Sequence, residues 1–435
     1  MRAVPGPRLA PPFSDISKAM DKRTSAILVI VMAVCAGGLR AEEARPAFGI
    51  SLSGFIKTDV LWDSRQTTSL REGHFLLFPK APRPDPAGED VNAGPVFNIL
   101  SIQTRLVGRV TGPDAFGART SGLIEGEFFG TADGDTNGFR LRHAAVTLDW
   151  KRTELMVGQY WHPLFATDCF PDVVSFNTGA PFQPFARAPQ VRLTRRFGRL
   201  SLVATALSQR DFASNGPDGA SSVYIRNAGL PELNFKAQYA VKDAAAGTEA
   251  LAGLGVDLMR IAPRLVTDSG YKTGESLGSA TVMAYGKLRT RGWTLKAEGV
   301  WGQNLHHLTM LGGYGVERVL DPVVRDQAYL PLETLSVWAE AHSNGAKWQG
   351  GLFGGYSRNL GARRPLAGPL YGRGTDIRDV VRVAPRLVRN AGKLRLAAEA
   401  EWTSAAYGVP DARGRVRSAS RTANARLLLA AYYFF

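Results

Sequence analysis

Cysteine is almost missing from this sequence, which has only Cys35 and Cys169 among 435 residues. Two cysteines exclude a disulfide scaffold, and they also exclude a metal cluster held by thiolates. No long apolar run follows residue 41, whereas a transmembrane helix needs about 20 predominantly apolar residues. The apolar period of about 3.6 residues that marks an amphipathic helix is missing from every long stretch. These absences argue against a helical membrane protein and favour β-strands as the main secondary structure.

The first 41 residues predict a secretory signal peptide. Lys22 and Arg23 precede an apolar run at 26–36, and small residues follow up to Ala41. We expect cleavage after Ala41, and we interpret residues 1–19 as an upstream extension. The whole chain has a formal charge of +15, and removing six Lys/Arg and two Asp/Glu with residues 1–41 leaves +11. The protein is therefore expected to be exported and basic.

Apolar and polar residues alternate along many short stretches of the remaining chain. The end of the chain has one wholly apolar face, made of Ala423, Ala425, Leu427, Leu429, Ala431, Tyr433 and Phe435. Similar alternation occurs at 102–110, 233–239, 293–301 and 393–403. Successive side chains of a strand point to opposite sides, so each stretch predicts a β-strand with one apolar face.

About sixteen such segments can be counted, and the connections between them alternate in length. The segments begin near Phe48, Phe97, Ala118, Gly138, Thr153, Pro189, Arg199, Gly229, Thr248, Leu277, Gly292, Pro331, Lys347, Asp376, Lys393 and Thr422. Short turns such as KRT and TRG alternate with long connections such as 66–96, 161–188, 305–330, 359–375 and 405–421. This alternation is typical of an outer-membrane barrel with short periplasmic turns and long extracellular loops. The sequence therefore predicts an all-β fold, a transmembrane antiparallel β-barrel over residues 42–435.

The last predicted strand is expected to pair with the first, because an open sheet edge in lipid leaves backbone groups without partners. An apolar alternating strand that ends on Phe435 resembles the C-terminal signal read by the outer-membrane insertion machinery of Gram-negative bacteria. The eight Trp and twelve Tyr suit the aromatic girdles of such barrels. We therefore expect location in the cell outer membrane, with its lipid, lipopolysaccharide and insertion machinery as partners.

Several stretches resemble the DcaP-like family of Gram-negative outer-membrane porins. GFIKTDVLWDSRQ (54–66) is similar to that family's first strand, with its G-x-x-K-x-D core. FRLRHAAVTLDW and ELMVGQYWHPLF, within 139–165, are similar to its Arg-rich hairpin and G-Q-x-W step, and RAPQVRLT (187–194) to its P-Q-x-R strand. The resemblance is specific over about 50–200 and architectural beyond. It implies a sixteen-stranded, trimeric diffusion channel that favours anionic solutes.

A barrel of about sixteen strands leaves an aqueous lumen, and a loop has to narrow it if the channel is to discriminate. The best candidate is 161–188, which follows the fifth predicted strand and is long, aromatic and poor in charge. Its only acids are Asp168 and Asp172. We expect this segment to fold inward as a constriction loop, with a position on the rim or at a trimer interface as the alternative.

Strand parity places a set of basic residues in the lumen, because charge on the lipid face is costly. The candidates are Lys57, Arg105, Arg109, Arg192 and Arg196, together with Arg140 and Arg142 if a β-bulge lies near His143. Arg378, Arg382 and Arg386 form another row on one face. Guanidinium binds carboxylate or phosphate through two parallel bonds, so these rows predict weak anion sites facing Asp168 and Asp172. Alternatively, some arginines pair with Asp59, Glu125 or Glu127 and only stabilise the wall.

Three other motifs carry little weight. GESLG (274–278) fits G-x-S-x-G, but no helix follows the serine as a nucleophile elbow requires. DGDTNG (133–138) resembles the start of a calcium loop, but Ala144 stands where Glu is needed. His306 and His307 form an isolated pair in a predicted surface loop, without a spaced third metal ligand.

The sequence thus predicts a porin that passes small polar, preferentially anionic solutes and performs no chemistry. The family resemblance implies a homotrimer, and no cofactor is expected. A nucleic-acid partner is not expected either, because the positive charge is spread over all strands. A substrate-specific uptake channel is the alternative within this class. An outer-membrane hydrolase or an adhesin is the alternative from other classes.

Overall fold

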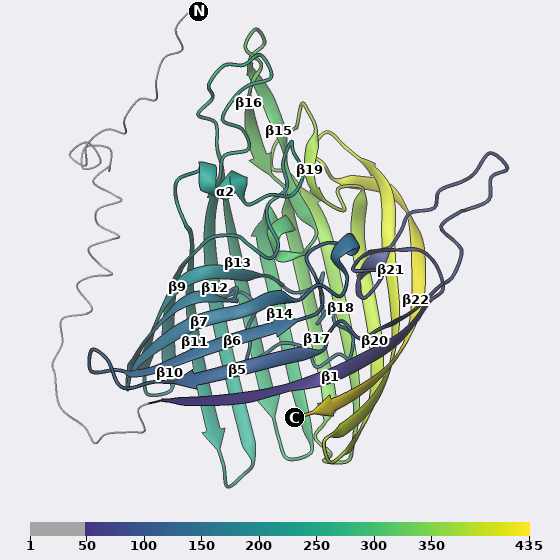
Figure 1. Ribbon diagram of the computed structural model, residues 1–435. Coiled ribbons are helices and arrows are strands. Elements are labelled where there is room, and N and C mark those ends of the chain that lie inside the picture. The colour runs from purple at the N-terminus through teal and green to yellow at the C-terminus, as the bar shows by residue number, and fades with distance from the viewer. Residues whose placement is uncertain (1–47) are drawn as a thin grey trace, which may run out of the picture.

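The computed structural model describes residues 48–435, so the predicted signal peptide at 1–41 lies outside the described residues. Its main feature is a closed antiparallel β-barrel of 16 strands (Figure 1). Each wall strand pairs with its neighbours along the chain, and β1 (Gly49–Asp63) pairs with β22 (Val416–Phe434). Phe435 also exchanges backbone hydrogen bonds with Gly54. The predicted fold class and the predicted closure are both confirmed.

The wall strands match the expected segments in number and order. β4 (Val96–Leu100) and β5 (Arg105–Thr111) both pair with β1 and form one strand interrupted at 101–104. The others are β6 (Arg119–Glu127), β7 (Arg140–Trp150), β8 (Thr153–Trp161), β9 (Arg187–Phe197), β10 (Leu200–Leu207), β11 (Glu232–Asp243), β12 (Thr248–Ile261), β13 (Leu277–Arg289), β14 (Trp293–Gln303), β17 (Glu333–Ser343), β18 (Trp348–Gly361), β20 (Ile377–Ala391) and β21 (Leu394–Pro410).

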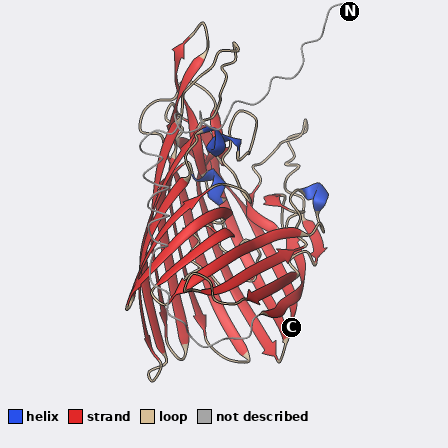
Figure 2. Cartoon of the chain, turned by 60° about the vertical axis from the view of Figure 1, so that its left-hand side comes forward, coloured by secondary structure: helices blue, strands red, loops and turns tan. Residues whose placement is uncertain are grey.

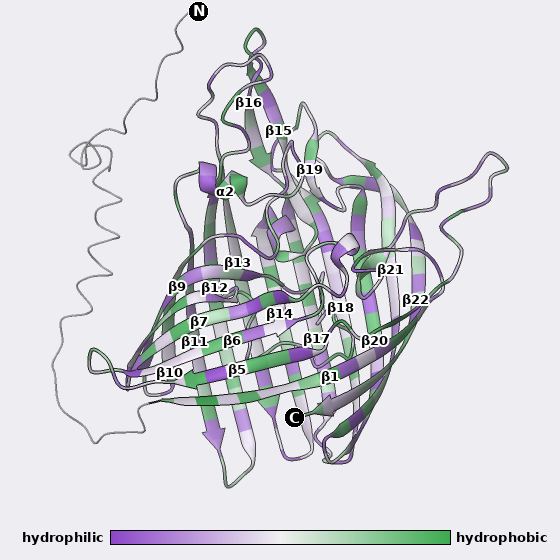
Figure 3. Cartoon of the chain, in the orientation of Figure 1, coloured by the Kyte–Doolittle hydropathy of each residue, from purple (hydrophilic) through white to green (hydrophobic). Residues whose placement is uncertain are grey.

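The alternation of apolar and polar residues along the sequence gives the barrel wall two different faces. On β12, Leu254, Val256 and Leu258 are exposed on the outer face, whereas Asp257 and Met259 between and beside them are buried. Figure 3 shows hydrophobic and hydrophilic residues alternating along the strands. The apolar face predicted for the end of the chain also points outward, since Leu427 and Leu429 are exposed. The outer surface is therefore an apolar band suited to lipid.

The two ends of the barrel differ, as the connection lengths predict. Long connections at one end hold α2 (Val223–Asn227) and a three-stranded sheet of β15 (Gly312–Asp321), β16 (Asp326–Pro331) and β19 (Leu370–Arg373) (Figures 1 and 2). Predicting plain loops at 305–330 and 359–375 was wrong, because these segments pair with each other. The predicted loop at 405–421 is also mostly strand, since β21 and β22 extend beyond their expected ends. Among the described residues, no helix is long and apolar enough to cross a membrane.

Three segments fold into the barrel and make its core. They are the hairpin of β2 (Thr67–Leu70) and β3 (Phe75–Pro79), the segment 162–186, and the 3-10 helix η3 (Leu305–Leu308) with the residues after it. Phe75, Phe182 and Leu308 are fully buried in one apolar cluster with inward side chains of the wall. The lumen is thus filled in part by these segments.

A β-bulge interrupts the pairing of β6 with β7. Glu125 pairs with His143 and Gly126 with Leu141, so Arg142 is the extra residue. The bulge lets Arg140 and Arg142 point inward on one side of it while Ala145 points inward on the other. The bulge predicted near His143 is confirmed. A second register shift lies between Ile377 and Asp379.

Candidate functional site in the barrel lumen

The segment 162–186, here called the inward segment, runs along the inner wall and is anchored to many strands. Glu399 of β21 accepts the backbone N–H groups of Val174 (2.7 Å) and Ser175 (3.1 Å). Arg382 of β20 donates to the carbonyl of Ala180 (2.8 Å). Ser336 on β17 donates to the carbonyl of Phe182 (2.8 Å), and Asn177 donates to Glu401 (2.8 Å). Buried charge-assisted bonds of this kind are strong, so they fix the position of the segment across the lumen.

Aromatic side chains pack the inward segment against the β2–β3 hairpin and the wall. Phe176 stacks on Phe129 with ring centroids 4.1 Å apart, and Phe165 stacks on Trp161 at 3.9 Å. Phe75 of the hairpin meets Phe185 at 5.0 Å. A segment buried in this way is a packed element inside the barrel and does not lie on the rim.

Glu127 on β6 is the centre of the arginine cluster of the lumen. This fully buried carboxylate accepts from Arg140 (2.6 Å) and forms ion pairs with Arg142 (2.6 Å) and Arg105 (3.3 Å). Glu125 pairs with Arg142 as well (2.6 Å). Three of the predicted luminal arginines are therefore ion-paired with two wall carboxylates, which is the alternative that the sequence left open.

Asp211, in the long connection after β10, extends this cluster. It accepts from Arg140 at 3.0 Å and from Arg187 at 2.6 Å. The guanidinium of Arg187 lies over Trp161, 4.8 Å from a ring centroid. Strand periodicity could not single out Arg187, because this residue begins a strand and its acidic partner lies in a long connection.

Lys57 and Arg196 also have carboxylate partners. Lys57 is fully buried, lies 3.1 Å from Asp59, and donates to the carbonyl of Val174 in the inward segment (2.9 Å). Arg196 forms ion pairs with Asp149 (3.2 Å) and Glu154. Lys57 therefore holds the inward segment. Arg196, on β9, links its own strand to β7 and β8 near the short turns.

Arg109, Arg192 and Lys236 differ, and they are here called the free cations. Within residues 48–435, none of them has a carboxylate oxygen within 4.0 Å. Arg192 donates to Gln190 (3.0 Å) and to the carbonyl of Trp161 (2.7 Å). Lys236 lies over the ring of Tyr285, 6.0 Å from its centroid. These three positive charges are therefore not ion-paired within the described residues.

The two acids of the inward segment have different surroundings. Asp168 is exposed and accepts a hydrogen bond from Gln238 (3.1 Å). Asp172 lies 2.7 Å from Lys296 and 3.0 Å from His342. Burial acts to raise the pKa of Asp172, but the hydrogen bonds and charges of His342 and Lys296 outweigh it and lower the pKa. Asp172 is also exposed, but Lys296 and His342 hold it, whereas Asp168 has no cationic partner within 4.0 Å among residues 48–435.

The predicted row of Arg378, Arg382 and Arg386 is interrupted by the register shift in β20. Arg382 and Arg386 are buried inward, and Arg386 pairs with Glu340 (2.5 Å). Arg378 is the extra residue of the shift and pairs with Asp379 (2.7 Å). Local parity cannot follow a row across an irregularity of this kind.

Strand parity in the sequence could have identified Lys236 and Lys296 as residues that point inward. Both belong to polar faces of alternating stretches that the sequence predicts as strands. The ionic partners of Lys296 could not have been found in this way, because Asp172 lies in a segment without strand periodicity.

His306 and His307 are not in a surface loop, as the sequence suggested. They lie in η3 beneath the long connections, and His307 is buried. Its Nε2 atom is 3.1 Å from Glu232, which also contacts His162. The expectation that the pair lacks further ligand-type neighbours is wrong, because tertiary folding brings two distant residues to it.

The other two motifs, DGDTNG and GESLG, make hydrogen bonds to neighbouring parts of the chain. Asp133 and Asp135 of DGDTNG form the 3-10 turn η2 (Asp133–Asp135), and Asp133 accepts the backbone N–H of Arg71 (2.7 Å). Ser276 of GESLG accepts from Arg260 (2.9 Å) and lies next to the start of β13.

The scan against protein-family models and the comparison with curated proteins found no match. Solved structures do resemble the chain. The outer membrane channel DcaP of Acinetobacter baumannii is similar with a TM-score of 0.66 and 16% identity, covering 91% of this chain and 100% of that one. The trimer form of OmpT, an outer membrane protein of Vibrio cholerae, is similar with a TM-score of 0.52 and 10% identity, covering 90% of this chain and 100% of that one. The chain therefore has the fold of outer-membrane β-barrels, and the resemblance predicted from its first 200 residues is confirmed at the level of fold.

Proposed function

We propose that the protein is an outer-membrane diffusion channel for small polar solutes, with a preference for anions. A barrel of this size has room for an aqueous path, and similar folds belong to proteins described as outer-membrane channels. The inward segment narrows that path. The barrel carries out transport without chemistry, and the alternatives of a hydrolase or an adhesin have no comparable support from the site.

The free cations carry the anion preference. Arg109, Arg192 and Lys236 have no carboxylate partner among residues 48–435, whereas Arg105, Arg140 and Arg142 are ion-paired. An unpaired guanidinium or ammonium in a confined pore raises the local concentration of anions, and a neutralised one does not. The proposal therefore assigns the anion selectivity to Arg109, Arg192 and Lys236.

Conductance in planar bilayers tests this proposal. We expect stepwise openings and a reversal potential under a salt gradient that indicates anion preference. R192Q/K236Q is expected to reduce or invert that preference, whereas R83Q, with an exposed side chain in the long connection after β3, removes one charge outside the lumen and leaves it unchanged. Cation preference of the wild type, or equal effects of both variants, would contradict the assignment.

A substrate-specific uptake channel is the second candidate. The observation that favours it is the number of segments in the lumen, since the β2–β3 hairpin and η3 lie beside the inward segment. Such a channel shows small conductance and solute flux that saturates with concentration. A diffusion channel gives flux proportional to concentration in liposome-swelling assays, so the same preparation distinguishes the two.

We also propose a homotrimer in the outer membrane, surrounded by lipid and lipopolysaccharide and inserted by the outer-membrane machinery. The trimer form named for OmpT of Vibrio cholerae and the fold likeness support it. Light scattering of the detergent-solubilised protein tests the oligomer, and a monomer would contradict it.

A further inference from the structure

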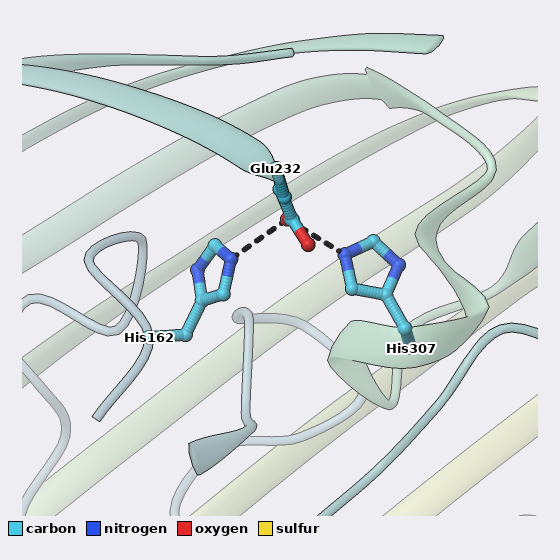
Figure 4. A group of neighbouring side chains, drawn as sticks. All are labelled: His162, Glu232 and His307. Atoms are coloured by element: carbon cyan, nitrogen blue, oxygen red, sulfur yellow. Dashed lines mark hydrogen bonds and ion pairs between the residues drawn. The ribbon is translucent and has the colours of Figure 1, made fainter. Parts of the chain in front are cut away.

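Two histidines and a glutamate from three distant parts of the chain meet in the interior (Figure 4). His162 begins the inward segment, Glu232 begins β11, and His307 lies in η3. The Nε2 atoms of the two histidines are 2.9 Å and 3.1 Å from the same Glu232 oxygen, Oε1. Figure 4 shows both rings pointing at this carboxylate from opposite sides. The three ligand-type atoms lie within 4.8 Å of one another.

A second carboxylate stands beside this group. Asp257 Oδ1 is 3.9 Å from His162 Nε2, and it accepts a hydrogen bond from Asn234 (3.0 Å). Glu232 is fully buried, and its second oxygen, Oε2, has no hydrogen-bond partner among the described residues. No Lys or Arg lies within 4.0 Å of either carboxyl group among the described residues, so a bound cation would stabilise both of them in the charged form.

We propose that His162, Glu232 and His307 form a binding site for a divalent transition-metal ion, with zinc as the best match. Two imidazole nitrogens and one carboxylate oxygen are a ligand set that Zn²⁺ accepts, and Asp257 or a water molecule completes four ligands. Ligand atoms around a tetrahedral zinc ion are roughly 3.3 Å apart, given metal–ligand distances of about 2.0–2.2 Å. The two nitrogen–oxygen separations of 2.9 Å and 3.1 Å need a small expansion, and the two nitrogens, which lie within 4.8 Å of each other, have to approach the same ion.

The charge balance favours a cation of charge two. A divalent ion neutralises Glu232 and Asp257 together, and the uncharged imidazoles add no charge. The softer nitrogen ligands select against Mg²⁺ and Ca²⁺, which prefer oxygen. The residues around Asp172, Glu340 and His342 are a poorer candidate, because Lys296 already supplies a positive charge 2.7 Å from Asp172.

Metal binding requires a proton to leave Nε2 on both rings, because each Nε2 faces Glu232 Oε1, a carboxylate oxygen that only accepts. Leu164 N–H donates to His162 Nδ1 at 3.2 Å, so the metal-free ring carries its proton on Nε2. A metal on Nε2 places the proton on Nδ1, and the backbone at Leu164 then has to turn away. The ion therefore adjusts the beginning of the inward segment at the same time as it ties that segment to β11 and η3.

The binding of Zn²⁺ and Co²⁺ to the full-length folded protein in detergent tests the proposal. After chelator treatment and dialysis against Zn²⁺, we expect about one tightly held ion per chain. Co²⁺ is expected to give the intense visible absorption of a four-coordinate ion. E232Q keeps the acceptor oxygen that both histidines use, so it preserves the barrel, and it should weaken binding at least about tenfold, as should H307Q.

H342Q is the matched control, because it removes a histidine of the other cluster and should bind as the wild type does. Far-UV circular dichroism verifies that each variant is a folded barrel. The proposal is overturned if the wild type retains no stoichiometric ion, or if E232Q and H307Q bind like the wild type. Loss of binding in H342Q would overturn it too. If E232Q and H307Q do not fold, the stoichiometry and the Co²⁺ spectrum of the wild type decide.

Discussion

At the scale of single residues, the lumen separates charges that hold the barrel together from charges that remain open. Glu127 faces Arg105, Arg140 and Arg142, and all four side chains are at least mostly buried. Burying charges without partners is expensive, so each member depends on the others. The same residue types therefore have different roles according to their neighbours.

Replacing Glu127 by glutamine should destabilise the barrel by roughly 3 kcal/mol, because it leaves buried guanidinium groups without their carboxylate. Urea unfolding in lipid vesicles, followed by tryptophan fluorescence, measures the change. E249Q is the control, since the Glu249–Lys287 pair lies near a short turn and is partly exposed. Equal effects of the two variants would contradict the central role of Glu127.

Cys169 is predicted to be unreactive in the folded protein. Burial raises the pKa of its thiol to about 12, and the Sγ atom donates to the carbonyl of Gly286 (3.1 Å). The thiolate is the reactive form, so labelling should be very slow at pH 7 and become faster as the pH rises toward that pKa. Mass spectrometry of the Cys169 peptide after maleimide treatment measures it, with the urea-unfolded chain as control. Rapid labelling of the folded barrel would disprove the burial of this residue.

At the scale of elements, the inward segment is held by its backbone as much as by its side chains. Glu399 binds two consecutive N–H groups, and Arg382 and Ser336 bind carbonyls farther along. These contacts come from β17, β20 and β21, which lie close together in one part of the barrel wall. The segment therefore has a fixed course although it contains no regular secondary structure over most of its length.

Replacing Glu399 by glutamine is predicted to loosen this segment near Val174. The two oxygens of Glu399 each accept one backbone N–H, and the NH2 group of glutamine cannot accept, so one of the two hydrogen bonds is lost. We expect larger and noisier single-channel currents and faster proteolysis within 162–186. S343A, which alters a side chain near the short turn between β17 and β18, should leave both measurements unchanged. Unaltered currents in E399Q would show that packing alone fixes the segment.

At the scale of the whole molecule, closure of the barrel joins the two ends of the described chain. Gly54 exchanges backbone hydrogen bonds with Phe435, and it also pairs with Leu106 of β5. A Cβ atom at Gly54 would lie 2.1 Å from the carbonyl oxygen of Arg105 and 2.9 Å from the ring of Phe435. Close approach of three strands therefore requires glycine at this position.

Replacing Gly54 by alanine should cost about 1–3 kcal/mol, because backbone has to move where the sheet closes. The neighbouring G108A is a matched control, since a Cβ there meets its nearest atoms at 3.7 Å and 3.8 Å. The yield of folded barrel on refolding into vesicles and the urea midpoint measure both variants. A G54A barrel as stable as G108A would refute the close packing at the junction.

The sequence predicted the wall well because strand alternation is a local property. Period two along 423–435 or 233–239 identifies the strands and their lipid faces without knowledge of partners. Even the bulge at Arg142 could be predicted, since the apolar face changes side there. The extended ends of β21 and β22 were missed, because the residues beyond the apolar band carry no alternation that distinguishes strand from loop.

The sequence alone determined a closed barrel and its strand order, and it suggested an inward row of basic residues, because these follow from periodicity and from the cost of charge in lipid. Only the tertiary structure decided which of those charges are neutralised and which are free. Glu127 pairs with arginines of β5 and β7. Glu232 contacts His162 of the inward segment and His307 of η3. Such encounters depend on how the chain folds inside the barrel, where contacts between distant residues leave no periodic trace in the sequence.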